Sequence, residues 1–449
     1  MKTTIAKVGI CLTALIFSAN LYAKVPPEEA EKLKSILTPL GAERAGSADG
    51  SIPQWTGEIP DTESDSGKRL DPFANEEPLY TIDQKNVGDY SETLSAGQVE
   101  MIRKYPEYRI DVYPTHRTAV APEYVYEGTY ENAVSAEDDQ NGYAIAKATS
   151  GIPFPIPQTG TQVMWNTLLK WQGVTSHIYF NTYIVTEDGN RVMVSDSEAW
   201  SQFPYYYKNF DMSEGMNEWN LYKLITHGPS QKSGEAILVR ETFDPTAGRP
   251  SWQYLTGQRR VRQLPNVAYD TPSFVTSGVS NFDEIFIWSG PLDRYNWELV
   301  GKKEMIVPYN NNGFVRVSGI DKVMKQRHLN PDHIRWEKHR VWEVKATLKE
   351  GARHVMPERV FYIDEDTWQP VLADGWDAKG QLWKTYWYLN LVASDLPGVV
   401  GSSFGHYDLQ TGEWIANVMP NEKSVYMEFI DRLPESVFSP RGLATQGIR

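Results

Sequence analysis

The chain has 449 residues and a formal net charge of −14, from 58 acidic and 44 basic side chains. Hydrophobic residues make up 41% and charged residues 23%, an ordinary globular composition that excludes a largely disordered chain. The acidic balance argues against a nucleic-acid partner, because a phosphate backbone needs a basic face. The aromatic fraction of 12% is unusual and favours β structure with large apolar or stacking surfaces.

The N-terminus has the pattern of a secretory signal peptide. Lys2 and Lys7 precede an apolar run at residues 8–17, and Ala23 offers a small residue for cleavage. The run is too short for a membrane span. Cys11, the only cysteine of the chain, lies in this segment. We therefore expect a mature protein without cysteine that resides in the periplasm.

The segment 24–160 is predicted to be an arm of short helices and loops. Pro27 opens an amphipathic pattern that we expect to form a helix ending at Gly41. Ser95 begins another helix through a capping box with the glutamine three residues later. Directly after the arm, Thr161 is expected to cap a short helix.

Beyond the arm, β-type runs alternate with short turns. In residues 340–349, Trp342, Val344, Ala346 and Leu348 share one face, which is the period-two pattern of a half-buried antiparallel strand. No long helices separate the runs, so the pattern predicts an antiparallel meander and excludes a parallel βαβ sheet. We expect strands at residues 177–186, 191–197, 219–226, 235–243, 251–255, 260–264, 297–307, 340–349, 360–363, 368–376, 382–391, 405–408 and 414–419.

Some short patterns match enzyme motifs but lack the required context. Ser403 lies in a Gly-x-Ser-x-Gly match, which needs a following helix to expose the serine, whereas a strand pattern follows here. Asp364 and Asp366 lie in an expected turn, where acidic residues are common for conformational reasons. No catalytic residue is predicted.

A group of histidines invites a metal hypothesis. His328, His333 and His339 are separated by five and six residues, so no two of them meet on one helix face. We interpret them as surface or interface histidines. Neither a metal site nor a cofactor is predicted.

An arginine cluster is the first candidate binding feature. On a strand, Arg260 and Arg262 share a face opposite Arg259. The pair suits an anionic headgroup or a carboxylate, which it could hold by charge-assisted hydrogen bonds. Cross-strand pairing with acidic neighbours explains the cluster equally well, so both interpretations stay open.

The aromatic side chains on the predicted strands are the second candidate feature. They can form a packed core or line a roomy apolar cavity that binds a hydrophobic ligand. Together with the arginine pair, the predicted ligand-binding residues are Trp252, Tyr254, Trp342, Trp383 and Trp387.

Several longer blocks resemble the Gram-negative family catalogued as domain of unknown function 1329. The blocks lie at residues 37–43, 45–46, 49–50, 52–57, 151–157, 257–262, 265–272, 301–305, 308–310, 339–342, 362–366 and 368. This family is grouped with the LolA-like and LolB-like lipoprotein carriers. The resemblance implies a mainly β, α+β fold: a large, open antiparallel half-barrel around an apolar cavity, closed by helices. Family members are often encoded beside exporters of the resistance-nodulation-division class, which implies a transport partner.

Residues and resemblance together predict four segments and one leading function. The segments are a signal peptide at 1–23, an arm and lid at 24–160, the half-barrel at 161–400, and a hairpin and tail at 401–449. We expect a periplasmic carrier that moves a lipid or other hydrophobic ligand between membranes, with an exporter and an outer-membrane partner. Its cavity should measure several hundred Å³. The alternatives are a secreted hydrolase or carbohydrate-active protein, and a scaffold that docks to an exporter without binding a ligand.

Overall fold

The computed structural model describes residues 24–446 except 65, 140, 216, 245–247 and 265–268. The predicted signal peptide therefore lies outside the described residues. None of the described helices combines the length and the apolar character that crossing a membrane requires.

One large sheet dominates the structure. Its strand order is β1-β2-β12-β13-β14-β15-β16-β17-β5-β6-β7-β8-β9-β10, with β11 paired to β12 and β18 paired to β5; β3 and β4 form a separate small ribbon. Within the described part of the chain, the strand pairs are antiparallel except for one parallel bridge between β2 and β12. The strands are β1 Tyr80–Ile82, β2 Ile110–Val112, β3 Glu137–Asp138, β4 Ile145–Ala146, β5 Thr175–Val185, β6 Arg191–Gln202, β7 Glu218–Gly228, β8 Ala236–Thr242, β9 Ser251–Leu255, β10 Arg260–Gln263, β11 Tyr295–Pro308, β12 Trp336–Leu348, β13 Glu358–Asp364, β14 Pro370–Trp376, β15 Leu382–Ala393, β16 Gly398–Asp408, β17 Trp414–Met419 and β18 Met427–Phe429.

The helices are short and lie around this sheet. The α-helices are α1 Pro27–Ala30, α2 Ala96–Lys104, α3 Glu123–Ser135, α4 Gly160–Leu168, α5 Asn312–Arg316, α6 Ile320–Val323 and α7 Pro440–Gln446. The 3₁₀ turns are η1 Glu31–Lys34, η2 Val87–Thr93, η3 Pro204–Tyr206, η4 Met212–Glu214, η6 Phe282–Glu284, η7 Pro331–His333 and η8 Glu435–Phe438.

Two predicted helix boundaries are wrong. The helix that begins at Pro27 does not reach Gly41 but ends with η1, because the chain folds back and forms a bridge between Leu37 and Glu43. α4 is capped by Thr159, whose hydroxyl accepts from the backbone of the residue three positions on, rather than by Thr161. The predicted capping box at the start of α2 is confirmed.

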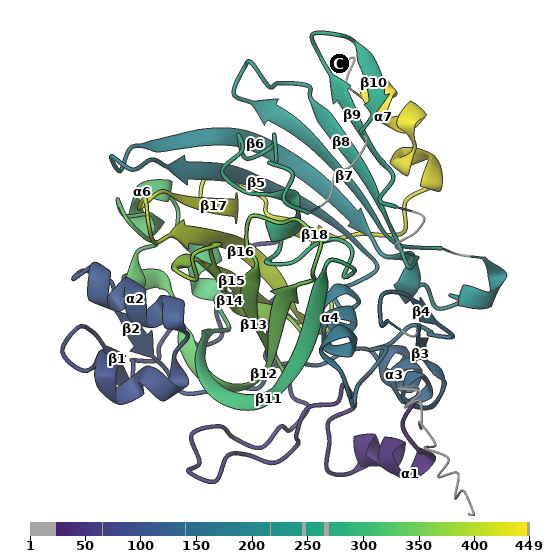
Figure 1. Cartoon of the computed structure of the whole chain (residues 1–449), viewed down its shortest axis with the longest axis vertical. Coiled ribbons are helices and arrows are strands. Elements are labelled where there is room, and N and C mark those ends of the chain that lie inside the picture. The colour runs from purple at the N-terminus through teal and green to yellow at the C-terminus, as the bar shows by residue number, and fades with distance from the viewer. Residues whose placement is uncertain are drawn as a thin grey trace, which may run out of the picture.

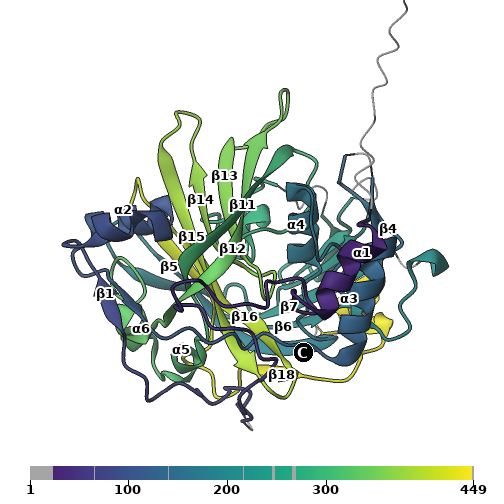
Figure 2. The ribbon, with the colours of Figure 1, turned by 90° about the horizontal axis from the view of Figure 1, so that it is seen from below.

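The sheet curls into an open half-barrel, as predicted (Figures 1 and 2). Register shifts interrupt the β5–β6, β6–β7, β7–β8 and β15–β16 pairs, and such bulges increase strand twist and bending. β10 and β11 are not paired with each other in the described chain, so the sheet does not close. We call the side that carries Phe180, Phe361 and Phe404 the inner face.

Both faces of the central strands are buried. In β13, Phe361 packs into the cluster on the inner face, while Val360 and Tyr362 pack into a second cluster on the outer face. The second cluster includes Ile102 of α2, so the N-terminal arm covers the outer face here. The predicted one-sided pattern of β12 is confirmed, since Val344 packs with the inner cluster.

The C-terminal strands are part of the same sheet. The predicted boundary at residue 400 falls inside β16, and β17 pairs with β5, the first long strand of the meander. The strands on either side of that boundary therefore form one curved surface. α7 packs over the outer face of β8, β9 and β10, where Leu443 contacts the cluster that contains Leu238.

Buried arginines fasten the arm to the sheet. Arg117 donates to both carboxylate oxygens of Asp366, at 2.9 and 2.7 Å, and to the backbone carbonyl of Glu43. Arg340 of β12 donates to Glu365 and to the carbonyl of Ala45. Arg117 and Asp366 are only 2% and 3% exposed, so water cannot replace a lost partner.

We predict that Arg117→Met destabilises the protein by about 3–5 kcal/mol, because it leaves the Asp366 carboxylate buried without its partner. Chemical denaturation measures the loss. The control is Arg191→Met, which removes a pair whose aspartate, Asp321, is 87% exposed and should cost no more than about 1 kcal/mol. Equal effects of the two changes would contradict the prediction.

Candidate functional site

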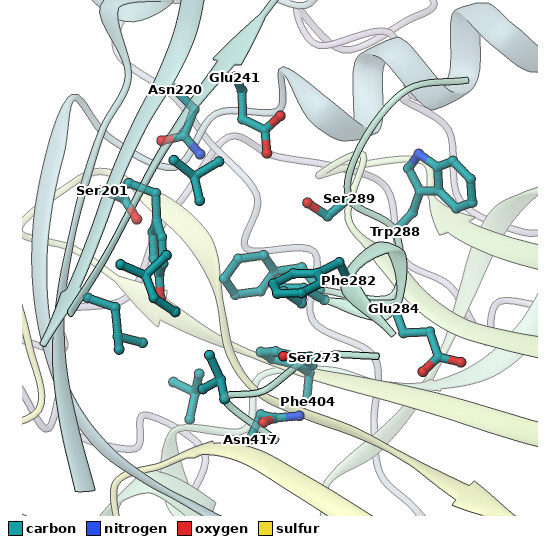
Figure 3. A pocket seen from close by; sticks show the side chains of 18 of the residues that line it. Ser201, Asn220, Glu241, Ser273, Phe282, Glu284, Trp288, Ser289, Phe404 and Asn417 are labelled. Carbon is teal, nitrogen blue, oxygen red and sulfur yellow. The ribbon is translucent and has the colours of Figure 1, made fainter. Parts of the chain in front are cut away.

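A cavity of 140 Å³ opens on the inner face of the half-barrel (Figure 3). One wall consists of strands β5 to β8, with contributions from β16, β17 and the end of α4; the opposite wall is the segment 273–289. Most lining side chains are apolar. They are Leu168, Phe180, Phe203, Trp219, Tyr222, Leu224, Ile237, Val239, Val275, Phe282, Ile285, Phe286, Trp288, Phe404 and Val418.

Strand alternation builds the first wall. Ile237 and Val239 of β8 line the cavity, whereas Leu238 between them packs on the outer face beneath α7. In the neighbouring β7, Asn220 lies directly opposite Glu241 of β8, and Figure 3 shows both side chains at the same end of the cavity. This end, which we call the polar end, carries the charged Glu241, whereas Ser201, Ser273 and Asn417 line the cavity away from it, so the wall is largely apolar with scattered polar groups (Figure 3).

The segment 273–289 forms the second wall, and two adjacent carboxylates hold it against the sheet. Asp283 accepts from Arg359 of β13 at 2.9 Å, and Glu284 accepts from Lys384 of β15 at 2.9 Å. Tyr386 also donates its hydroxyl to Glu284 at 2.7 Å. Both carboxylates are buried, so these bonds fix the segment without competition from water.

We call the contacts of Asp283 and Glu284 with Arg359 and Lys384 the anchor of the segment. The nearby cations determine the ionisation of Glu284 in this anchor. Burial alone would raise the pKa of Glu284, but Lys384, His406 and Arg359 outweigh it and lower the pKa to about 2. Burial, together with Lys384, lowers the pKa of His406 to about 3. The anchor is therefore an ionised glutamate beside a neutral histidine at neutral pH.

Two further charged groups of the wall form a pair at the polar end. Arg249 forms a buried salt bridge with Glu241 and donates to Ser289 at 2.7 Å.

Lys170, which follows α4, also lines the cavity. Its ammonium donates to the backbone carbonyl of Thr167 at 3.0 Å, and burial lowers its pKa to about 8.

Several polar atoms of the cavity wall have no hydrogen-bond partner among the described residues. They include the acceptor Asn220 Oδ1, the donor Trp288 Nε1, and the hydroxyls of Ser273 and Ser280. Buried polar groups are normally satisfied, and because these atoms have almost no accessible surface, they can meet a ligand only after a local movement of their side chains.

The predicted aromatic residues lie elsewhere. Trp252 and Tyr254 of β9 lie opposite Leu238 and Ala236, so they face outward and pack beneath α7. Trp387 packs in the outer-face cluster. None of these side chains lines the cavity.

The remaining two predicted tryptophans pack against the inner-face cluster without lining the cavity. Trp342 stacks on Trp368, and the indole of Trp383 donates to Asp408 at 2.7 Å. A ligand-binding role for the predicted aromatic set stays untested, and the structure does not bring the set together.

Arg260 and Arg262 share a face of β10, the last strand of the sheet. Arg262 lies opposite Gln253, which lies opposite the cavity-lining Ile237, so Arg262 belongs to the inner face. Two strand spacings place it roughly 10 Å from Ile237. Both arginines are exposed and form no ion pair with a described residue. Arg259 lies in the turn before the strand, not on the opposite face.

The prediction of surface histidines is wrong for His328 and His339, which are 2% and 1% exposed. His339 stacks on Tyr309 with ring centres 3.9 Å apart, and its Nε2 lies 3.0 Å from Glu337. His328 bonds the carbonyl of Leu329 at 2.7 Å. Packing against aromatic and charged neighbours, which the spacing does not encode, accounts for their burial.

The expected turn at Asp364 and Asp366 is present, and both side chains are buried. With His339 these residues place potential metal-ligand atoms within 4.8 Å of one another. Both oxygens of Asp366 are already bonded to Arg117, and burial with the nearby Asp366 raises the pKa of Asp364 to about 7. We interpret the group as part of the ion-pair network that holds the arm.

Lys170 and the segment 273–289 are not among the residues that the sequence predicts for the site. The signal for the segment is the adjacent pair Asp283–Glu284 inside an otherwise apolar run, since two neighbouring acids among aromatic residues need buried cations. No pattern in the sequence distinguishes Lys170 from an exposed lysine at the end of a helix.

Comparisons with known proteins identify the family. Residues 81–444 match the family model described as protein of unknown function (DUF1329). A Pseudomonas aeruginosa protein, uncharacterized protein PA3922, is 36% identical over 462 aligned positions that cover 100% of both chains. The chain therefore belongs to the DUF1329 family, which confirms the resemblance.

Two solved structures are similar at lower identity. A DUF1329 family protein from Desulfovibrio piger aligns with a TM-score of 0.43 at 15% identity, covering 63% of this chain and 97% of that one. A putative outer membrane lipoprotein-sorting protein domain from Vibrio parahaemolyticus aligns with a TM-score of 0.43 at 12% identity and the same coverage.

The Glu284 anchor should make stability depend on acid pH. A carboxyl whose folded pKa is about 2, against an ordinary 4.5, stabilises the fold above pH 4.5 and loses that contribution as the pH falls toward 2. The difference in unfolding free energy between wild type and Glu284→Gln should therefore shrink by about 3 kcal/mol over this range. Denaturation at a series of pH values measures it.

The control for this prediction is Glu435→Gln, at a glutamate that is 64% exposed. Its difference from wild type should stay constant with pH. A constant difference for Glu284→Gln as well would show that Glu284 does not carry the buried charge.

Proposed function

We propose that this protein is a periplasmic binding and carrier protein for a small hydrophobic or amphiphilic ligand. The observation that carries the proposal is the cavity between β5–β8 and the segment 273–289, whose wall is largely apolar and carries a few polar side chains. Enclosing apolar surface gains roughly 25 cal/mol per Å² removed from water, which favours ligand entry without chemistry. The polar side chains of the wall would orient the ligand.

The cavity limits the size of the enclosed group. Its 140 Å³ is smaller than the several hundred Å³ expected, and close to the size of about 150 Å³ at which an engineered apolar cavity holds benzene. One ring or a short alkyl chain therefore fits without movement of the walls. A full acyl chain requires displacement of the segment 273–289.

The periplasmic location and the transport role are proposals that go beyond the cavity. The signal-like pattern before Lys24 supports export of the chain. An exporter of the resistance-nodulation-division class and an outer-membrane component are the proposed partners for transfer between membranes. No described residue of the arm at 24–160 lines the cavity; α2 covers the outer face, whereas Leu40, Val125 and Phe154 pack into the inner-face cluster, and a role of the arm as a lid stays a proposal.

Filling the cavity should weaken the binding of a neutral apolar probe. Ser201 of β6 lines the cavity and is partly exposed, so Ser201→Phe adds a ring to the cavity with little strain. We expect wild type to bind toluene at one site and the variant to bind it at least about tenfold more weakly. Calorimetry measures the affinity.

The matched control is Ser201→Ala, which removes the hydroxyl without adding volume and should retain binding. A scaffold that carries no ligand predicts no binding by wild type. Equal binding by wild type and Ser201→Phe would place the probe outside this cavity, and either result would refute the proposed site.

The rim arginines should assist an anionic ligand. Arg262→Ala, alone and with Arg260→Ala, should slow the association of octanoate about threefold at low salt, with a smaller effect at high salt. Because neither arginine has an ion-pair partner among the described residues, the melting temperature should stay the same. A lower melting temperature with unchanged binding would support the structural interpretation of the pair instead.

A further inference from the structure

Lys170 occupies an unusual electrostatic position. It is 8% exposed and lies in the wall of the cavity, two residues beyond the end of α4. One of its three N–H groups donates to the carbonyl of Thr167. No carboxylate of the described chain forms an ion pair with it, and burial is the only influence that shifts its pKa.

The other charged groups of the same cavity are compensated. Glu241 pairs with Arg249, and Glu284 pairs with Lys384 behind the segment. The described wall therefore contains one ammonium group without a counter-charge. An uncompensated buried charge lowers the stability of the folded state by several kcal/mol. A protein usually retains such a group only where a counter-charge neutralises it.

A capping role explains only part of this arrangement. A cation at the C-terminus of a helix interacts favourably with the helix dipole and with the last carbonyls, which accounts for the bond to Thr167. Such a cation gains no advantage from burial, since an exposed lysine reaches the same carbonyls in water. The placement of Lys170 in the wall of an apolar cavity requires a second explanation.

We infer that the cavity binds an apolar molecule that carries a carboxylate, and that this carboxylate pairs with the ammonium of Lys170. The inference rests on the proposed function and names its ligand class. The apolar part of the ligand, one ring or a short alkyl chain, contacts the aromatic wall. The indole N–H of Trp288 and the hydroxyls of Ser273 and Ser280 are further unpartnered donors in the same wall.

Pairs of acids and alcohols with the same chain test this inference. Calorimetry with hexanoate, octanoate and dodecanoate, and with the corresponding alcohols, gives the preference of wild type for the acid. We expect a preference of at least about tenfold, since a hydrogen bond to a charged partner in a buried site contributes that much. In Lys170→Met the preference should disappear while the alcohols bind as well as before or better.

Lys223→Met is the matched control. Lys223 is also fully buried and burial also lowers its pKa to about 8, but it lies on β7 over Trp200, whose cluster packs on the outer face. Removing this lysine should leave the acid preference of the cavity unchanged. Loss of the preference in both variants would show that net charge, and not the cavity lysine, attracts the acid.

The outcomes separate this inference from the proposed function. If wild type binds acids and alcohols equally, the inference fails while the carrier proposal stands. If Lys170→Met lowers the melting temperature and keeps the acid preference, Lys170 is only a helix cap and the inference fails. If no acid or alcohol binds to wild type, both the inference and the proposed function fail.

Discussion

The anchoring of the segment 273–289 is the constraint on which the cavity depends. An open half-barrel exposes an apolar inner face, and this face must be covered for the protein to remain soluble. The segment covers it but does not fill it, because Asp283 and Glu284 are fixed to Arg359 and Lys384 on the far strands. Ion pairs have directional geometry, whereas apolar contacts would allow the segment to collapse onto β7 and β8.

The same principle fixes the arm to the sheet. Its helix α2 packs on the outer face against β14 and β15, and the pairs Arg117–Asp366 and Arg340–Glu365 hold the arm at the turn after β13. The sheet is therefore buried on both sides, which explains near-continuous apolar runs such as β13 and β15 in an antiparallel sheet. One covering layer is densely packed and the other contains the cavity, so the two faces have different roles.

The sequence predicted the strands well but the site poorly, for a physical reason. Strand pattern and turns are local, so the meander from β5 to β17 follows from period two and short connections. The face on which a residue lies depends on register and on what covers each side. Tryptophan is a residue type that is common in ligand sites. Yet Trp252 packs beneath α7, and Trp387 packs in the outer-face cluster. Lys170 and the segment 273–289 show no periodic pattern, and their roles arise only from contacts distant in sequence.

The anchor also sets which ligands can enter. A ligand larger than the cavity must displace the segment and leave Arg359 and Lys384 buried without partners, at about 3–5 kcal/mol each. Each additional buried CH₂ returns about 0.8 kcal/mol. Roughly ten additional methylenes are then needed before displacement becomes favourable. The structure thus accommodates small amphiphiles in its present form, and it admits long acyl chains only by opening the segment, so that ligand length rather than a separate signal governs the transition.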